Sequence, residues 1–278
     1  LHRQAARWHQ RNGRLTDAVR HAAHAGDWPL AADIVIDGLA ISEIIEPTGG
    51  PSPADALAGM PHDEAWTEPQ PHLVSAALAL SAGQIESAVA GLDAAQEILE
   101  RRPADHETAA RLAAAMIRLA VARRSGNLAA AAEAATHTEA LAGKASVGGL
   151  ARYPAIQARA LSARGAVELW SGHLDEAVRV LDSGVVAAAI PGCEPARAAC
   201  LGHLALAEAL RGRLRRAAML AEQAATTCAG EGQRPPVRHA NPAALVALAW
   251  VHLEHHDLKQ TRSRLQQLNA VLEASPDK

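Results

Sequence analysis

The densest group of side chains that could bind a metal lies near the carboxyl end of the sequence. His252, His255 and His256 occur there together with Glu254 and Asp257, and imidazole and carboxylate groups are common zinc ligands. On a helix, His252 and His256 would share one face. A zinc site needs a third or fourth ligand from another element, and the order HLEHHD differs from the H-E-x-x-H of metalloproteases. We therefore expect a solvated helix end here rather than a metal centre.

A second set of polar side chains is spaced as if to line a binding groove. These residues fall on segments that we expect to form the first helices of successive helical hairpins, whose polar stripes would face one concave surface. Arginine can bind a carboxylate or a phosphate through two parallel hydrogen bonds, and tryptophan offers a stacking face for a sugar or an aromatic ring. The candidate groove residues are Arg111, Arg118, Arg164, Glu168, His203, Glu208, Asn241 and Trp250.

Each candidate groove residue also has an ordinary structural explanation. The polar stripe of an amphipathic helix usually faces solvent, and Trp170 and Trp250 would fill gaps left by alanine-rich partners. His203 follows the apolar spacing of Cys200 and Ala207, which favours a core or inter-repeat histidine. From the sequence, the binding and the structural interpretations both stay open.

Catalytic nucleophiles are not indicated by any local pattern. No Ser/His/Asp or Cys/His arrangement can be inferred from residues scattered over an alanine-rich chain. The three cysteines, Cys193, Cys200 and Cys228, are an odd number without C-x-x-C spacing, which argues against a disulfide framework and favours a reducing compartment. We expect Cys200 and Cys228 to be small core residues, and we expect no enzymatic activity and no cofactor.

The composition favours helices that pack closely. Hydrophobic residues make up 49% of the 278 residues, but aromatic residues only 2%, and phenylalanine is absent. Alanine dominates the long segments, and it has the highest helix propensity and lets helices approach one another. The β-branched run from Ile34 to Ile41 is ambiguous and lies in a helical context. The sequence therefore predicts an all-α fold without a credible strand.

The charge balance argues against a nucleic-acid interface and a membrane span. The formal net charge is −3, whereas phosphate contacts need clustered surplus arginine and lysine. The best local exception is the basic run Arg211, Arg213, Arg215 and Arg216, which is more typical of a solvated face or of a helix C-terminus. No stretch approaches 18 uncharged apolar residues and no signal peptide is visible, so we expect a cytoplasmic protein. The helical pattern at Leu1 suggests a piece of a longer chain.

A turn motif recurs along the whole chain. It consists of glycine, a polar residue and a large apolar residue that starts a helical run. Glycine would take the left-handed conformation that ends one helix, the polar residue would cap the next, and the apolar residue would anchor the turn on its neighbour. The copies begin at Gly13, Gly26, Gly83, Gly126, Gly172 and Gly212, with a degenerate seventh copy at His256.

The spacing of the motif predicts a helical repeat protein. From Gly83 onward the copies follow at intervals of 43, 46, 40 and 44 residues, the length of one hairpin of long helices. Such hairpins would be tetratricopeptide-like and would stack into a right-handed superhelix with a concave binding surface. We predict N-terminal helical repeats over 1–46, a Pro-rich connection over 47–72 with one short helix around Ala54 to Ala58, and one continuous superhelix over 73–274. The segment from Gly230 to Pro242 is expected to be a loop.

The opening stretch LHRQAARWHQRNGRLTDAVRHAAHAGDWPLAADIV (Leu1 to Val35) resembles the start of a known sensor domain. This is the tetratricopeptide-like superhelical domain of the large LuxR-type, MalT-like transcription activators, where a Leu-His-Arg, Ala-Ala, Trp opening leads into Asn-Gly, Asp-Ala and Ala-Gly-Asp. ALAGMPHDEA (Ala56 to Ala65) is similar to the family's short Leu-Pro segment. NPAALVALAWVHLEHHDLKQTRSRL (Asn241 to Leu265) looks like its closing repeats. The resemblance covers essentially the whole chain.

The resemblance implies a sensor without its output domains. Members of the family join a P-loop ATPase, a winged helix, the helical sensor and a C-terminal helix-turn-helix. In this sequence Gly143 and Lys144 are followed by Ala145, without the upstream glycine of a P-loop, and only EASPDK follows Leu272. The family would therefore contact ATP and DNA only through domains outside this segment.

These inferences give one expected function and two alternatives. The first is an effector-sensing domain whose concave groove receives a small molecule or a regulatory protein and relays its occupancy to the ATPase and DNA-binding domains. The runner-up is a stand-alone tetratricopeptide scaffold that binds peptide segments of partner proteins. The third is a metal-dependent hydrolase built on the C-terminal histidines, which would require stoichiometric metal in the purified protein.

Overall fold

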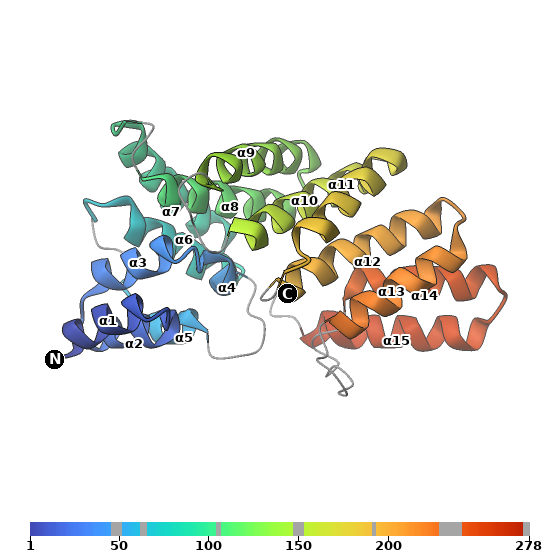
Figure 1. Cartoon of the computed structure of the whole chain (residues 1–278), viewed down its shortest axis with the longest axis horizontal. Helices are drawn as coiled ribbons and strands as arrows, with labels where there is room; N and C mark the ends of the chain where they lie inside the picture. Colours follow the sequence, from blue (N-terminus) through green and yellow to red (C-terminus); the bar gives the residue numbers. More distant parts are fainter. Residues whose placement is uncertain are drawn as a thin grey trace. The chain divides into compact units, whose positions relative to one another are not determined.

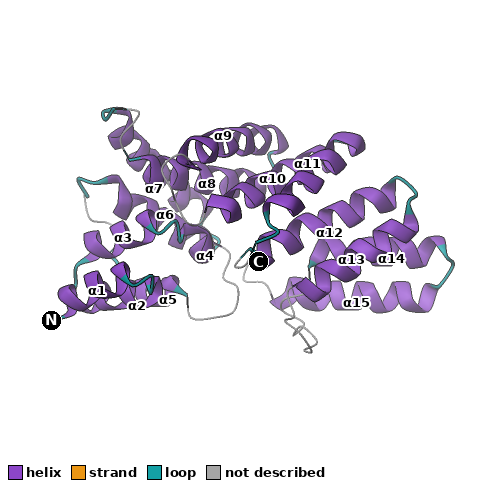
Figure 2. Ribbon diagram, in the orientation of Figure 1, coloured by secondary structure: helices purple, strands orange, loops and turns teal. Residues whose placement is uncertain are grey.

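The computed structural model describes residues 1–45, 52–61, 66–103, 107–146, 153–190, 193–227 and 241–274. In these ranges every regular element is an α-helix, fifteen in all, which confirms the predicted all-α class (Figures 1 and 2). The ambiguous run from Ile34 to Ile41 is divided between the end of one helix and the start of the next. No helix of the described ranges is long and apolar enough to cross a bilayer.

The chain divides into two compact units, Leu1–Ala130 and Ala131–Pro276. In unit 1, α3, α6 and α8 contact one another and form the core. Around them, α2 packs on α3, while α4 and α7 each pack on both α6 and α8. Its division from unit 2 lies at Ala130, whereas the sequence analysis placed boundaries at 46 and 72. The helices of unit 1 are α1 (His2–Arg11), α2 (Leu15–His24), α3 (Trp28–Asp37), α4 (Ile41–Ile45), α5 (Pro53–Leu57), α6 (Pro69–Ser81), α7 (Ile85–Glu100) and α8 (Thr108–Arg124).

Unit 2 is a row of helical hairpins. The pairs α10 with α11, α12 with α13 and α14 with α15 pack internally, and their first helices contact one another in the order α10, α12, α14. The second helix of a pair also contacts the first helix of the next pair, α11 with α12 and α13 with α14. The helices are α9 (Leu128–Ser146), α10 (Tyr153–Trp170), α11 (Leu174–Ala187), α12 (Glu194–Leu210), α13 (Leu214–Thr227), α14 (Pro242–Glu254) and α15 (Leu258–Ala274).

The predicted left-handed turn is confirmed at every copy of the motif. All six motif glycines have positive φ, between 65° at Gly26 and 82° at Gly172, and His256 takes the same region with φ 58°. In each turn the residue after the glycine donates its N–H to a carbonyl five positions earlier, as His173 does to Glu168 over 2.9 Å. This is the Schellman arrangement, which satisfies carbonyls left unpaired at a helix end.

The capping and anchoring parts of the motif hold at some copies only. Side-chain oxygens of Asp27, Asn127 and Asp257 accept N–H groups of the next helix at 3.3, 3.0 and 3.0 Å. Arg14, Gln84 and His173 make no such bond. The anchor prediction is wrong for Leu128 and Leu258, whose side chains remain 41% and 63% exposed. The backbone conformation is therefore the constant part of the turn.

Four prolines from the expected connections lie inside helices, and one of them, Pro53, opens α5. Pro69 and Pro71 are in the first turn of α6, and Pro242 opens α14. The N–H of a residue in the first turn has no intrahelical partner, so proline is tolerated there. The helix α6 therefore starts at Pro69, four residues before residue 73, where we predicted the superhelix to begin. The short helix predicted in the Pro-rich connection is confirmed as α5, whose N-terminus is capped by Ser52. The loop predicted from Gly230 lies, up to residue 240, outside the described residues.

Small residues let the helices of unit 2 approach closely. A Cβ added at Gly165 would lie 2.4 Å from Leu181, and one at Gly184 would lie 2.6 Å from the Cys200 sulfur. Cys200 is fully buried, as predicted, and burial raises the pKa of its thiol to about 12. Cys228 lies outside the described residues. The core consists mainly of alanine and leucine because larger side chains would not fit between these helices.

The turn geometry predicts opposite effects for two identical substitutions. At Gly126 a methyl group meets no atom within 4 Å but must adopt φ 67°, so Gly126→Ala should lower the unfolding free energy by about 1 to 2 kcal/mol. Gly143 lies in α9 without positive φ and with the same open space, so Gly143→Ala should raise it by about 0.5 to 1 kcal/mol. Urea unfolding followed by circular dichroism measures both. Changes of the same sign would contradict this account.

The raised pKa of Asp33 in α3 predicts that replacing this carboxylate by a neutral side chain stabilises the fold at neutral pH but not at acid pH. Burial, reinforced by nearby Asp37 and Glu68, raises the pKa of Asp33 to about 6. The ionised form therefore opposes folding above pH 6, and this penalty disappears as the pH falls below the unfolded-state value near 3.8. Asp33→Asn should raise Tm at pH 7.5 and lose that advantage by pH 4. The exposed control Asp93→Asn should have little effect at either pH, and an equal Tm gain at both pH values for Asp33→Asn would count against burial of the charge.

Candidate functional site

Arg111 is a helix-capping residue in this structure. Its guanidinium donates to the carbonyl oxygens of Leu99, Arg102 and Pro103 at 2.6, 3.0 and 3.4 Å. The Leu99 carbonyl lies in the last turn of α7, where helix geometry leaves acceptors short of partners, and the other two lie just beyond the helix. Arg111 therefore has a structural role in unit 1, and its binding of an effector stays a prediction.

The same function is served by Arg124, which the sequence analysis did not single out. Arg124 donates to the carbonyl oxygen of Leu80 and, at 3.2 Å, to that of Ile45. It thereby joins the end of α8 to the ends of α6 and α4. The third arginine, Arg118, is half-buried in the middle of α8, and the described residues show no hydrogen bond from it. No spacing rule would have identified Arg124, because its acceptors are backbone atoms distant in sequence.

Arg164 and Glu168 of α10 are engaged in ion pairs within unit 2. Arg164 contacts Glu139 of α9 and Glu176 of α11, each at 3.2 Å. Glu168 lies 2.9 Å from the Nδ1 atom of His173 in the following turn. The guanidiniums beside Glu176, above all that of Arg179, lower the pKa of its carboxyl group. Both predicted groove residues therefore connect neighbouring helices.

Glu208 is the most deeply buried charged group of the described residues. Its side chain is 0% exposed, and guanidinium nitrogens of Arg211, Arg213 and Arg216 lie 3.7, 3.4 and 3.5 Å from its oxygens. Arg211 extends the network to Asp175 at 2.6 Å. The pairs connect the end of α12 to α11 and α13. Glu208 is therefore an internal counter-ion rather than a groove residue.

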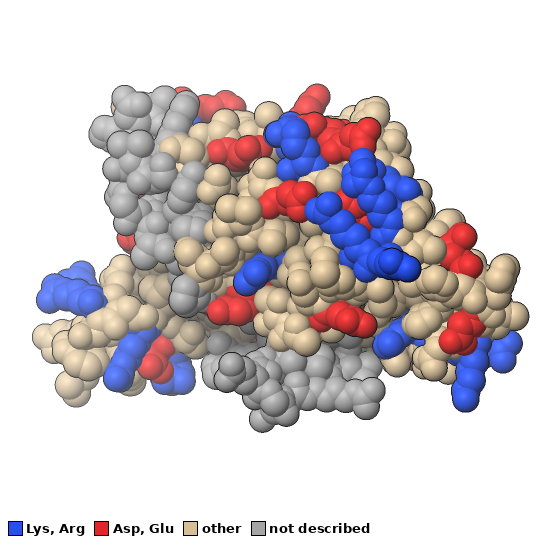
Figure 3. All heavy atoms as spheres, turned by 45° about the vertical axis from the view of Figure 1, so that its right-hand side comes forward, with Lys and Arg blue, Asp and Glu red and all other residues tan. Residues whose placement is uncertain are grey.

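This network also explains the basic run near the turn at Gly212. Three of its four arginines face carboxylates, and Arg216 makes a further pair with Asp182 at 3.4 Å. Arg213 and Arg216 remain 51% and 43% exposed, as expected for a solvated face, whereas Arg211 is only 19% exposed. Basic and acidic side chains also lie next to one another on the face drawn in Figure 3. This face thus offers mixed charge instead of the unbroken basic surface that a phosphate backbone requires.

His203 and Asn241 make contacts that fix helices. The Nδ1 of His203 lies 3.0 Å from the carbonyl oxygen of Ala199, one turn earlier in α12, which is a contact within its own helix. Asn241 accepts the N–H of Ala244 at 3.1 Å and donates to the carbonyl of Ala198 at 2.9 Å. It therefore caps α14 and holds it against α12, and its place in a binding groove stays a prediction.

Trp250 is the candidate groove residue that presents an apolar face to solvent. Its exposed fraction is 39%, and Trp170, which we expected to fill a gap, is 61% exposed. Trp250 shares the α14–α15 hairpin with four other exposed apolar side chains. Leu258, Leu265 and Leu272 recur every seven residues, which places them on one face of α15. We call this set the hairpin apolar surface: Trp250, Leu253, Leu258, Leu265 and Leu272.

A shallow hollow lies beside α9. Its volume is about 630 Å³, and its lining, which includes Ala132, Ala140 and Leu141, is mainly apolar. Glu133 and His137 add polar atoms at its side. The volume falls in the range of small-molecule sites, but the hollow is open to solvent.

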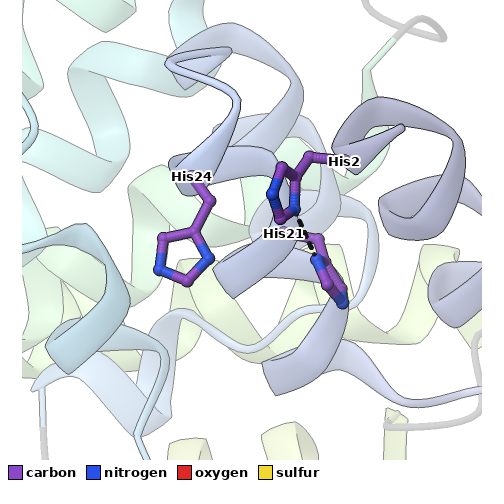
Figure 4. A group of neighbouring side chains, drawn as sticks. All are labelled: His2, His21 and His24. Carbon is purple, nitrogen blue, oxygen red and sulfur yellow. Dashed lines mark hydrogen bonds between the residues drawn. The ribbon is translucent and has the colours of Figure 1, made fainter.

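Three histidines meet in unit 1 that the sequence analysis did not combine. His2 of α1 and His21 and His24 of α2 each offer a ring nitrogen, and these atoms lie within 4.8 Å of one another (Figure 4). Burial, followed by the nearby His2 and His9, lowers the pKa of His21. Among the described residues, the C-terminal histidines that opened the sequence analysis form no comparable group of three ligands. The spacing of His21 and His24 was a visible signal, but the third partner comes from another helix.

The Glu208 network predicts a large loss of stability on neutralisation. Glu208→Gln leaves three guanidiniums around an uncharged, buried side chain, which should lower the free energy of unfolding by about 2 to 3 kcal/mol. The loss should be smaller than for a fully buried ion pair because the arginines reach solvent. Glu168→Gln is the matched control at the equivalent position before Gly172, where one histidine replaces the arginines. Its cost should stay below about 1 kcal/mol in the same thermal unfolding assay. Equal losses would refute the counter-ion role.

Comparison with known proteins adds a likeness of fold. No protein-family model matches the sequence, and no curated protein matches it. Among solved structures, BtubC (BKLC) from P. vanneervenii is similar with a TM-score of 0.53 and 14% sequence identity, over 86% of this chain and 90% of that chain. At this identity the likeness concerns the helical fold alone.

Proposed function

We propose that this chain is a non-catalytic binding module of a MalT-like, LuxR-type transcription activator. In this proposal an effector or a regulatory protein binds the helical repeats, and its occupancy is relayed to ATPase and helix-turn-helix domains of the same polypeptide. The family assignment rests on the sequence of the opening stretch from Leu1 to Val35. It is compatible with the hairpins described above and is independent of the likeness to BtubC.

The observation that carries the binding role is the hairpin apolar surface. Large exposed apolar side chains that gather on one element mark protein or ligand contacts more often than the rest of a protein surface does. Tryptophan is also enriched where binding energy concentrates. In α14–α15 these side chains are between 39% exposed, at Trp250, and 63% exposed, at Leu258. A partner helix laid along α15 would cover the three leucines that recur every seven residues.

The hairpin contacts support a tetratricopeptide-like superhelix as the scaffold of this surface. In unit 2 the first helices contact each other in succession, and each second helix packs on the following pair. We infer that repetition of this contact gives a right-handed superhelix, because each pair adds a similar rotation to the row. Binding would then favour one arrangement of the pairs, and the parent protein would respond by a shift between resting and assembly-competent populations.

A stand-alone scaffold for peptide segments is the second candidate. The heptad spacing of Leu258, Leu265 and Leu272 favours it, since an amphipathic helix docks by matching such a stripe. The two candidates differ in what surrounds the segment in its gene. A P-loop coding region upstream and a helix-turn-helix downstream support the activator, and their absence from the reading frame favours the scaffold.

The position of the hairpin apolar surface predicts that ligand binding depends on Trp250 and not on Trp8. We expect a Tm increase of the purified chain with the matching member of a panel of sugars, other metabolites and amphipathic peptides, because binding to the folded state alone stabilises it. Trp250→Ala should remove most of this increase without loss of helical circular dichroism. Trp8→Ala is the control, since Trp8 is 55% exposed in unit 1, where Arg14 lies 5.9 Å from its ring centre. If Trp8→Ala abolishes the increase while Trp250→Ala preserves it, the binding surface is wrongly placed.

A further inference from the structure

We propose that His2, His21 and His24 bind a zinc ion that links α1 to α2. The three side chains offer nitrogen ligands from two helices, all within 4.8 Å of one another. Figure 4 shows the rings of His2 and His21 meeting nitrogen to nitrogen, with the ring of His24 beside them. This site goes beyond the binding role proposed above, because it lies in unit 1 and uses none of the residues of the hairpin apolar surface.

The spacing of the nitrogens is close to that of a coordinated metal. The Nδ1 atoms of His2 and His21 are 2.9 Å apart. With zinc–nitrogen bonds of about 2.0 to 2.1 Å and tetrahedral angles, two imidazole ligands would be about 3.3 Å apart. A separation of a few tenths of an ångström would admit the metal between them. Without metal, one of the two rings donates its N–H to the other, and zinc would take the place of that proton.

The backbone brings the three histidines together. The turn at Gly13 reverses the chain, so the start of α1 lies against the end of α2. Ala6 and Ala22 are fully buried between the two helices, and such small side chains allow a close approach. His21 and His24 are three residues apart and share the face of α2 that meets His2. The ligand set therefore depends on two well-defined helices rather than on a loop.

The ring of His9 stacks against the ring of His21. The two rings stack with their centres 5.2 Å apart and an angle of 20°. The Nδ1 atom of His9 is buried and has no hydrogen-bond partner, while Asp17 lies 3.9 Å away. A neighbour that restricts the orientation of a ligating ring is a usual feature of histidine metal sites. His9 is thus a positioning residue for His21.

The chemistry of the ligands selects the class of metal. Three imidazoles without a carboxylate suit zinc and its neighbours nickel and copper, whereas magnesium and calcium require oxygen ligands. His2 and His24 are exposed, so water can complete the coordination sphere. We commit to zinc and use magnesium as the negative comparison.

The test is calorimetric titration of the chain, without any histidine tag, with zinc chloride and with magnesium chloride. We expect one zinc per chain, no binding of magnesium, and a Tm increase on addition of zinc. His21→Gln should weaken zinc binding by at least about tenfold and reduce the Tm increase in proportion. His2→Gln and His24→Gln change exposed side chains and should do the same while the helical circular dichroism stays unchanged.

The C-terminal histidines supply a matched control. His255→Gln with His256→Gln removes two of three histidines that are close in sequence but form no three-ligand group in the described structure. This variant should bind zinc like the unsubstituted chain. Absence of zinc binding, or equal affinity in the His2, His21 and His24 variants, would overturn the proposal. Neither result would bear on the Tm response through Trp250, so the two proposals can fail separately.

Discussion

The backbone reversal at the left-handed turns is the constraint on which the rest of the structure depends. A residue with positive φ ends one helix, and the hydrogen bond that spans it satisfies a carbonyl at that helix end. Only three residues separate the paired helices, so the next helix must return alongside the first. The capping side chain and the apolar anchor vary between copies, as Gly83 and Gly126 illustrate with Gln84 and Asn127 after them. The recurring φ is what makes one helical pair resemble another.

The alanine-rich composition determines what holds these pairs together. Helices with small side chains approach closely but bury little apolar area per residue, so polar contacts between neighbours contribute more. Arg124 and Arg111 donate to carbonyls at helix ends, Asn241 joins α12 and α14, and Glu208 collects three arginines. Long polar side chains reach such positions because nothing bulky stands between the helices. This is why residues predicted to bind a ligand mostly bind other helices.

The two proposed sites follow from what this packing leaves exposed. On α14–α15 the apolar side chains exceed what the pair itself can cover, which leaves Trp250 and the three spaced leucines in contact with solvent. On α1–α2 the close approach of two short helices brings imidazoles within 4.8 Å of one another. One surface suits an apolar or helical partner and the other a transition metal. They belong to different units and need not act together.

The sequence by itself determined the helical class, the seven left-handed turns of the recurring motif and the short helix in the Pro-rich segment. These features depend on interactions within a few residues, namely alanine's helix propensity, glycine's access to positive φ and proline's lack of an N–H. The prediction that prolines keep these segments out of helices was too strict, because Pro69, Pro71 and Pro242 occupy first turns, where the missing N–H has no cost. Only the tertiary structure decided the partners of Arg111, Glu208 and Asn241, and that His2 meets His21 and His24. Those partners lie on different helices, and helical periodicity fixes the face of a side chain but not the neighbour that the face meets.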